Sequence, residues 1–496
     1  MIVNDIRPLV APLISILCAV LILWRGDNTF LRRLFSISAA IIKWIIVFSM
    51  LPGSLAGKIY VTELIPFTPG ISFLLRVDGL GMFFGMISST LWIITTVYAI
   101  GYMEGEHARK RFFAFFALCV STTIGIAFAG NLFTLFVFYE MLTVCTYPLI
   151  LHDETPEAMK AGRKYLIYTL TGGSFILFAT AMTFYSAGTV TFSEPGILSI
   201  STGVGLLAAI FAMFMLGFGV KAAIMPLHGW LPSAMVAPTP VSALLHAVAV
   251  VKAGVFGITR IIYNIFGVSL LKEMALKGMP VAEFLMWAAM ITIICASLMA
   301  LMQDNLKKRL AYSTISQLSY IVLGVSLLTP NGALGGIVHI ANQAFMKITM
   351  FFAAGAIYKK THKKNISEMH GIGHKMPLTM ATFTIASLGM MGLPPTAGFI
   401  SKWYLCLGAL DAGKMVVVVV LLVSSFLNAA YFLPIVYRAY FMKPQDGNLK
   451  TDEAHWTLLA PCVICALYTI GLGLFADLPF VPLALARGAV MQFFGV

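Results

Sequence analysis

The sequence has little charge. Only 11% of its 496 residues are Asp, Glu, Lys or Arg, whereas 59% are hydrophobic. Soluble domains carry about 25% charged residues, so this chain cannot cover itself with a soluble surface. Its mean hydropathy of +0.92 supports the same conclusion. The lipid bilayer is therefore the expected solvent, and a soluble fold is excluded.

Motifs for metal or nucleic-acid binding are also missing. The seven cysteines fall inside apolar runs, and the one C-x-x-C pair, Cys462 and Cys465, has no second pair with which to form a zinc or iron–sulfur site. We interpret the cysteines as small buried hydrophobic residues and expect no metal, no cofactor and no catalytic residue. Despite the net charge of +13, the chain has no basic helix and no RNA-binding aromatic motif, so we expect no nucleic-acid partner.

The chain contains instead a long series of apolar runs. A membrane-spanning helix needs about 20 mostly apolar residues, and fourteen segments are candidates. They are roughly 7–24, 35–51, 79–102, 112–129, 131–151, 164–186, 203–225, 240–263, 281–302, 309–328, 332–358, 378–410, 415–440 and 456–476. We therefore predict an all-α polytopic membrane protein with about 14 transmembrane helices, embedded in a lipid bilayer.

Basic residues are unevenly divided between the predicted loops. When the faces are assigned alternately from the N-terminus, one face receives 20 of the 33 Lys and Arg residues and the other receives eight. The richer face should be cytoplasmic, which places both termini outside the cytoplasm. We predict a multi-pass protein of the cell inner (plasma) membrane. Its first apolar run lacks the features of a signal peptide and should be a retained span.

The remaining basic residues lie within the predicted spans, as does one acid. An isolated charge at this depth costs at least about 2.5–3.5 kcal/mol, so such groups must pair, line water or exchange protons. Burial favours the uncharged forms of lysine and glutamate, which suits groups that bind and release protons near neutral pH. The candidate proton-relay residues, including two histidines in the same spans, are Glu140, Lys221, His246, Lys252, His339, Lys347 and Lys402.

One further lysine within a span, Lys43, has no evident role. Its span is strongly apolar, and no other ionisable residue lies near it in the sequence. Lysines in spans commonly extend their ammonium group to the lipid head groups, which is one interpretation of this residue. Its function stays open.

Two of the candidate lysines lie beside helix-breaking prolines. In "GFGVKAAIMPLHGWLP", Pro226 follows Lys221, and in "GMMGLPPTAGFISKWYL", Pro394 and Pro395 precede Lys402. Proline removes a backbone donor, and broken helices at membrane depth mark ion sites in transporters. The breaks lie about five spans apart, so spans 4–8 and 9–13 are predicted to form two inverted five-helix repeats, each with a broken helix.

These repeats give a domain organisation in four parts. Spans 1–3 lie in residues 1–110, the first repeat in 111–263 and the second in 264–440, and the last span and the tail lie in 441–496. An odd number of spans in each repeat requires that the second repeat be inserted upside down relative to the first. The prediction depends on topology and on the position of the breaks, because sequence identity between the two blocks is weak.

Several longer motifs carry a resemblance. They include "FVFYEMLTVCTYPLI", "KAAIMPLHGWLPSAMVAPTPVSALLHAVAVVKAGVFGI", "HIANQAFMKITMFFAAGAI" and "GLPPTAGFISKW". From about residue 76 to 440 the chain resembles the proton-conducting antiporter-like family. This family comprises membrane-arm subunits of respiratory complex I, group 4 membrane-bound hydrogenases and Mrp-type multisubunit cation/proton antiporters.

The resemblance implies a role for each residue in the first half. Glu140 resembles the family's fifth-helix glutamate, and Lys221 resembles the seventh-helix lysine that pairs with it. Lys252, with His246 beside it, resembles the central relay residue. No enzymatic step is expected within this chain itself, although it could be part of a larger translocase complex.

The resemblance also implies how the path continues. His339 and Lys347 resemble the link to the second half-channel, and Lys402 resembles the terminal broken-helix residue. Because lysine and glutamate can both carry a proton, Lys402→Glu is expected to be tolerated. The partners would be other membrane subunits, protons and a monovalent cation, with Na⁺ as the expected ion. The favoured function is that of a Mrp D-like antiporter subunit. The alternative is a proton-pumping subunit of a complex I-type NADH:quinone oxidoreductase or a group 4 hydrogenase.

Overall fold

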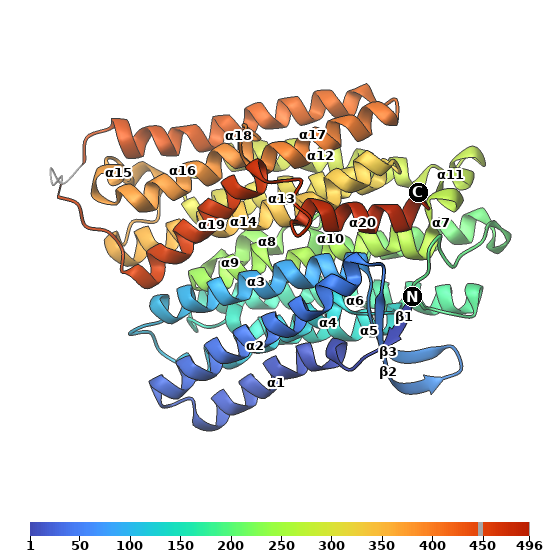
Figure 1. Ribbon diagram of the computed structural model, residues 1–496. Coiled ribbons are helices and arrows are strands. Elements are labelled where there is room, and N and C mark those ends of the chain that lie inside the picture. The colour runs from blue at the N-terminus through green and yellow to red at the C-terminus, as the bar shows by residue number, and fades with distance from the viewer. Residues whose placement is uncertain (445–449, 496) are drawn as a thin grey trace.

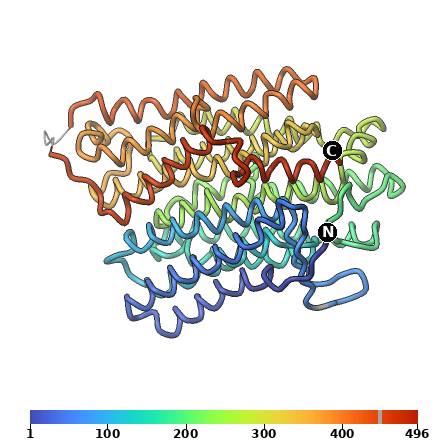
Figure 2. The backbone as a smooth tube through the Cα atoms, in the orientation of Figure 1, coloured from blue at the N-terminus to red at the C-terminus, as the bar shows by residue number. Residues whose placement is uncertain are grey.

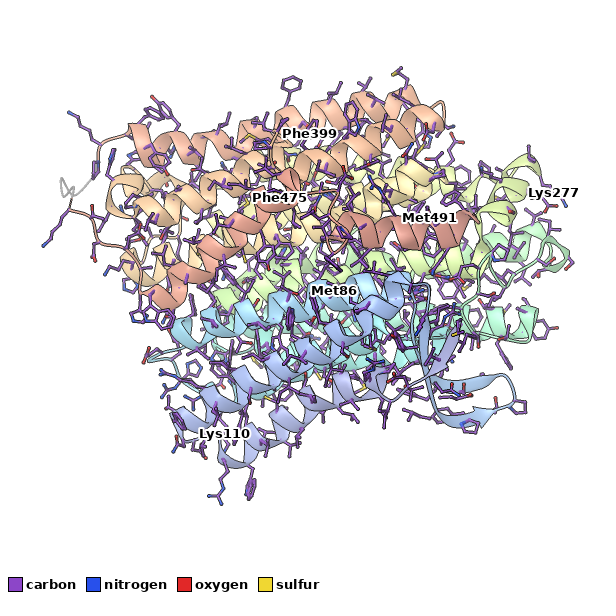
Figure 3. All side chains as sticks on the ribbon, viewed as in Figure 1. Met86, Lys110, Lys277, Phe399, Phe475 and Met491 are labelled. Atoms are coloured by element: carbon purple, nitrogen blue, oxygen red, sulfur yellow. The ribbon has the colours of Figure 1, made fainter. Side chains whose placement is uncertain are left out.

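Long helices run side by side through the whole molecule (Figure 1). The computed structural model describes residues 1–444 and 450–495. Both termini lie at the same end of the helix array, and the backbone trace shows the helices crossing back and forth between its two ends (Figure 2). The side chains of Lys110 and Lys277 mark these opposite ends (Figure 3).

The first four helices pack against one another, and α3 and α4 also contact helices later in the chain. In this bundle, α1 packs against α2 and α4, and α3 also packs against α2 and α4. The bounds are α1 Arg7–Arg25, α2 Thr29–Leu55, α3 Gly79–Tyr102 and α4 Arg109–Ala127. Polar side chains set two of the helix starts, since Asn28 accepts from Phe30 N and Leu31 N, and Asp78 accepts from Gly81 N.

A small three-stranded sheet accompanies the helical fold that was predicted. The strands β1 (Ile2–Asn4), β2 (Ile59–Thr68) and β3 (Ile71–Val77) form a sheet in which β1 is parallel and β3 antiparallel to β2. Pro69 and Gly70 connect β2 to β3, and Gly70 has φ +85°, which suits glycine in a tight turn. The β-branched and aromatic residues of "IYVTELIPFT" and "ISFLLRV" favour strands, and both segments lie between predicted spans, where helix periodicity gives no signal.

The central part of the chain contains the first break. Helix α7 ends at Ala222, and the chain resumes regular helix only after a short irregular segment. The elements are α5 Leu132–Ile150, α6 Pro156–Ala187, η1 Ile200–Thr202, α7 Val204–Ala222, α8 Trp230–Ser233, η2 Ala234–Val236, α9 Thr239–Ala247, α10 Val250–Arg260, the π-helix η3 Ile261–Phe266 and α11 Val268–Leu276.

The last part of the chain contains the second break, between α16 and α17. The prolines Pro394 and Pro395 lie in this gap, as predicted. The elements are α12 Val281–Leu301, α13 Leu306–Ser326, α14 Pro330–Thr361, η4 Ile366–Glu368, α15 Ile372–Lys375, α16 Pro377–Met391, α17 Ala397–Asp411, α18 Met415–Phe441, α19 Trp456–Leu474 and α20 Pro482–Phe494.

Twelve helical segments within the described residues are long and apolar enough to cross a membrane, two fewer than the fourteen predicted spans. The predicted span 309–328 corresponds to α13, which carries three basic residues in its first turn and a polar face. The predicted span 378–410 corresponds to α16 and α17, each too short to qualify alone. The difference therefore comes from one polar helix and one broken helix.

Two helical segments lie at the centre of the molecule. The apolar stretches of Thr239–Phe266 and Pro330–Thr361 are completely buried, whereas only 33% of that of Met415–Phe441 is buried. Large apolar side chains of α18 are exposed, among them Phe426 and Phe441. The central helices therefore provide a protein interior for polar groups, and the outer helices present apolar surface suited to lipid.

Candidate functional site

Lys221 lies in the last turn of α7, directly before the first break. Its side chain is fully buried, and its Nζ donates to the carbonyl oxygen of Tyr139 over 2.6 Å. The same nitrogen lies 3.4 Å from the centroid of the Tyr139 ring, a cation–π geometry. The buried ammonium group thus has a carbonyl and an aromatic face as its partners.

The break after Lys221 is stabilised from within the protein. Ala223 has φ 56°, and the helix hydrogen-bond pattern stops there. The indole nitrogen of Trp230 donates to the carbonyl oxygen of Val220 over 2.7 Å, and Met225 N donates to Thr292 Oγ1 over 3.1 Å. Backbone groups freed at membrane depth must find such partners. The tryptophan in "LHGWLP" therefore stabilises the open turn beside Lys221.

Glu140 lies next to Tyr139 on α5 but makes no ion pair with Lys221 within 4.0 Å. Its Oε1 is buried and has no hydrogen-bond partner among the described residues. The side chain as a whole is only partly buried, and its neighbour Met141 is 39% exposed. Glu140 therefore lies near the edge of the protein interior, with one carboxylate oxygen directed inward.

Gly173 on α6 provides the space for the Glu140 carboxylate. A Cβ at this position would lie 2.2 Å from Glu140 Oε1, so any larger residue must displace the carboxylate. The displaced group is the end of a flexible side chain, so the helix itself can accept the change. Gly173 therefore positions Glu140.

Gly173→Ala should reduce ion transport about tenfold or more while the protein still folds, because displacing a reacting group by about 1 Å can cost up to about 100-fold in rate. Alanine in a helix is about 0.5–1 kcal/mol more favourable than glycine, so thermal stability should not fall. Gly471→Ala in α19 is the matched control, since nothing lies within 4 Å of the added Cβ. Transport at the wild-type rate in Gly173→Ala vesicles would show that the position of Glu140 is unimportant.

Lys252 is fully buried on α10 and donates to Gln343 Oε1 on α14. His246 lies in the last turn of α9 and is also fully buried, and neither ring nitrogen has a hydrogen-bond partner in the described structure. Its ring lies 4.7 Å from that of Phe351, and its electrostatic neighbours include Lys252 and Lys347. The two residues predicted as the centre of the relay are therefore both in the interior, although no hydrogen bond joins them.

His339 and Lys347 lie on α14, one helical turn before and one helical turn after Gln343. The His339 ring forms hydrogen bonds at both nitrogens, with Ser401 Oγ at Nδ1 (2.7 Å) and Gln317 Oε1 at Nε2 (3.0 Å). Lys347 Nζ donates to Ser313 Oγ and lies 3.5 Å from the carbonyl oxygen of Leu310. Polar groups of three helices, α13, α14 and α17, therefore meet here.

Lys402 follows Ser401 on α17 and points into the second break. Its Nζ donates to the carbonyl oxygens of Met390 (3.0 Å) and Met391 (2.8 Å) and to Ser425 Oγ (2.9 Å). These two carbonyls belong to the last turn of α16, where the helix pattern is interrupted. The lysine thus satisfies backbone groups that the break leaves free.

The second half of the predicted set hydrogen-bonds to polar side chains that were absent from that set. Lys252 donates to Gln343, His339 pairs with Gln317 and Ser401, and Lys347 donates to Ser313. These contacts form separate groups among the described residues, and Lys402 has partners of its own. Gln317, Ser313 and Gln343 are detectable as polar residues at helical spacing, and Ser401 as the neighbour of Lys402. Nothing in the sequence indicates that Tyr139 binds Lys221 through its carbonyl.

Lys43 does not extend to the head groups, so that interpretation is wrong. Its side chain is fully buried, and its Nζ lies 3.4 Å from the centroid of the Trp92 ring. No hydrogen-bond partner of this nitrogen is present in the described residues. The side chain points into the α1–α4 bundle because the neighbouring positions Ile41, Ile42 and Ile45 occupy the exposed face of α2.

Comparison with known proteins identifies the family. Residues 129–428, which include the two breaks and every candidate relay residue, match the family described as NADH:quinone oxidoreductase/Mrp antiporter, TM. The chain belongs to this family. Its curated relatives include NADH-quinone oxidoreductase subunit N of Desulforudis audaxviator (strain MP104C), 35% identical over 77% of this chain and 78% of that protein.

A second relative comes from a different kind of assembly. A probable K(+)/H(+) antiporter subunit from Rhizobium meliloti (strain 1021) is 30% identical over 82% of this chain, which spans 40% of that protein's length. The family membership therefore covers both antiporter and oxidoreductase subunits.

Solved structures share the complete fold. A chain of the Mrp complex from Dietzia sp. DQ12-45-1b superposes with a TM-score of 0.87 at 21% identity, covering 99% of this chain and 97% of that one. A chain of the membrane-bound sulfane sulfur reductase, an archaeal respiratory membrane complex, gives 0.87 at 26% identity, covering 98% and 96%. The protein is thus a multi-span integral membrane protein of the type found in bacterial or archaeal respiratory and antiporter complexes.

Proposed function

We propose that this chain is a Mrp D-like membrane subunit of a multisubunit cation/proton antiporter. It would move protons through the buried relay residues and couple this movement to monovalent cation transport, with Na⁺ as the proposed cation. The observation that carries the proposal is the set of buried amines and one imidazole from Lys252 to Lys402, each hydrogen-bonded to polar groups near the centre of the molecule.

The chemistry of this set suits proton transfer. An imidazole accepts a proton at one nitrogen and releases one from the other, and His339 has a hydrogen-bond partner at each. Gln343 lies one turn from His339 on α14 and holds Lys252 through its Oε1. The hydroxyl of Ser401 can both donate and accept, so it can exchange a proton with the His339 ring.

The first half of the path depends on Glu140 and Lys221. Lys221 is held by Tyr139 and by a broken helix, while the Glu140 carboxylate lies against Gly173 without a partner. A small movement of either side chain would bring opposite charges together. We propose that this movement changes the affinity of Lys221 for its proton. His246 would act beside Lys252, and residues 111–263 and 264–440 would form the two inverted repeats.

The alternative function is proton pumping in a complex I-type or group 4 hydrogenase assembly. It is favoured by the 35% identity to an NADH-quinone oxidoreductase subunit N, and the same buried groups would serve it. The 30% identity to a probable K(+)/H(+) antiporter subunit supports the antiporter. In both cases the partners would be other membrane subunits in the inner (plasma) membrane, with both termini outside the cytoplasm.

Transport in sealed vesicles distinguishes the two functions. The complete native assembly is reconstituted without any redox substrate, and a Na⁺ or K⁺ gradient is imposed while internal pH is recorded. The antiporter predicts a pH change that depends on the cation gradient. Proton movement that requires a quinone or an electron donor, with no response to either cation, would establish the alternative instead.

Lys402→Glu should impair the protein, contrary to the expectation from sequence. A carboxylate would face the carbonyl oxygens of Met390 and Met391, and each buried group left unsatisfied costs about 1–3 kcal/mol. Lys402→Gln is the matched control, because its amide can still donate to these carbonyls but cannot carry a proton. We expect a lowered Tm for Lys402→Glu, a near-normal Tm for Lys402→Gln and loss of transport in both. Full transport by Lys402→Gln would remove Lys402 from the relay.

A further inference from the structure

Lys43 is a buried ionisable group that the relay does not use. It lies near the middle of α2, on the interior side of the α1–α4 bundle, and its electrostatic neighbour is Cys18 of α1. A permanent ammonium group without an acceptor at this depth costs at least about 2.5–3.5 kcal/mol. If the Lys43 amine can release its proton, the neutral form does not carry this desolvation cost.

Other polar atoms inside the same bundle also lack partners. They are Ser15 Oγ on α1 and Ser88 Oγ, Trp92 Nε1 and Thr96 Oγ1 on α3, all buried and without a hydrogen bond in the described structure. Ser88, Trp92 and Thr96 recur every four residues, so they share the face of α3 that contacts Lys43. Buried hydroxyl and amine groups of this kind are the usual partners of internal water. The bundle interior is therefore polar at the level of Lys43.

A stripe of polar and small residues connects Lys43 to one end of the bundle. Arg32, Ser36, Ala39 and Lys43 lie on one face of α2 at helical spacing, and all four are buried. Ser36 Oγ donates to the carbonyl oxygen of Arg32 over 2.9 Å, and Arg32 Nη1 donates to Gly26 O in the α1–α2 loop over 2.6 Å. This loop lies at the basic end of the molecule, where the Lys110 side chain is also found (Figures 1 and 3).

Toward the C-terminal end of α2, the same face is apolar. Beyond Lys43 the buried residues are Val47, Met50 and Leu51, which offer no hydrogen-bonding side chain. The helices packed on α2 add little charge there. Helix α3 contains no Asp, Glu, Lys, Arg or His, and the basic residues of α4 lie in its first turn. Helix α1 contributes Cys18, whose Sγ donates to Phe35 O, and Arg7, which pairs with Asp5 and donates to Ser49 O on the exposed side of α2. In β2, Glu63 lies beyond the opposite end of α2, in an exposed position.

We propose that Lys43 is a second proton-binding site, separate from the relay, which is loaded from the Arg32 end of the bundle and closed beyond Val47. The amine nitrogen takes up one proton from water-borne hydronium and returns it by the same route, with no other bond made or broken. The face of Trp92 stabilises the ammonium form. Because the route has one opening, the site reports the proton concentration on one side of the membrane.

Trp92 fluorescence tests this proposal independently of transport. The signal is the emission of the complete assembly minus that of a Trp92→Phe assembly, recorded against pH. The wild-type signal should shift with pH, because the ammonium group forms and disappears over the indole ring. In Lys43→Met and in Lys43→Arg the shift should be lost, since methionine carries no charge and arginine keeps its charge throughout. The two variants should define the two ends of the wild-type titration.

Two further measurements separate this site from the relay and test its single opening. Lys221→Ala should retain the Trp92 titration even if it loses transport, so failure of the proposed function leaves this result unaffected. In sealed vesicles of known orientation, a pH change should shift the signal only when made on the side of the Lys110 end. A wild-type signal that does not respond to pH, an unchanged titration in Lys43→Met, or a response from the opposite side would overturn the proposal.

Discussion

Lys221→Ala should abolish proton transport while leaving the protein assembled. The lysine supplies the titratable amine at the first helix break, where its Nζ donates to the carbonyl oxygen of Tyr139. Removing it does not leave the Tyr139 carbonyl without a donor, because Thr143 Oγ1 also donates to this oxygen over 3.4 Å. The break itself should persist, since Trp230 continues to bind Val220 O. Vesicle transport and the yield of intact complex are the two measurements.

The matched control is Lys110→Ala. This lysine forms an exposed ion pair with Asp27 at 2.7 Å, and exposed pairs contribute only about 0–1 kcal/mol. Its loss removes one positive charge of the same kind without touching the interior. Transport should therefore stay near the wild-type rate. Equal impairment of both variants would indicate a general effect of charge rather than a specific role for Lys221.

Asp78→Asn should cause the largest loss of stability among single substitutions outside the relay. Arg260 Nη1 and Nη2 donate to the two Asp78 oxygens over 2.6 and 2.7 Å, and both side chains are almost fully buried. Breaking a buried pair by removing one partner costs about 3–5 kcal/mol, because the other charge stays buried. The pair also joins the start of α3 to the end of α10, the helix that carries Lys252. A large decrease in Tm and loss of transport should therefore appear together.

The stabilisation that the Asp78–Arg260 ion pair provides depends on pH. Burial alone would raise the pKa of Asp78, but the charge and hydrogen bonds of Arg260, with the more distant Arg76, hold it below its usual value. The stabilisation is therefore present at neutral pH and is lost only as the pH falls below about 3.9, through the lowered pKa. Asp27→Asn, which breaks an exposed pair, is the control and should change stability by less than about 1 kcal/mol. A change of that small size in Asp78→Asn would contradict the assigned role.

Helix-forming segments and their breaks were predictable because single-residue properties determine them. Apolar runs of sufficient length give the spans, and Pro226, Pro394 and Pro395 lie in the observed gaps between helices. The inward direction of Lys221 and Lys402 follows from the cost of charge in lipid. The same principle applied to Lys43 should have favoured burial, but a lysine side chain is long enough to reach the surface, so sequence left both possibilities open.

Contacts between distant segments were not predictable in the same way. Gln343 binds Lys252 from 91 residues away, and Tyr139 binds Lys221 from 82 residues away. No local pattern encodes such pairs, because they depend on how helices pack. The small sheet was missed for a related reason, since β1 lies at the N-terminal end of the chain and pairs with β2, which lies far from it in the loop between α2 and α3. For Lys402→Glu the structure predicts impairment where the sequence predicts tolerance. The sequence does not show that Lys402 donates to the carbonyl oxygens of Met390 and Met391.

The most direct test of a buried proton relay is the pH change that a cation gradient produces inside sealed vesicles containing the complete assembly, recorded side by side for the wild type and Lys221→Ala at equal protein content. The relay predicts a clear pH change for the wild type and, for Lys221→Ala, a trace no different from that of empty vesicles. A Lys221→Ala trace that follows the wild type would contradict it.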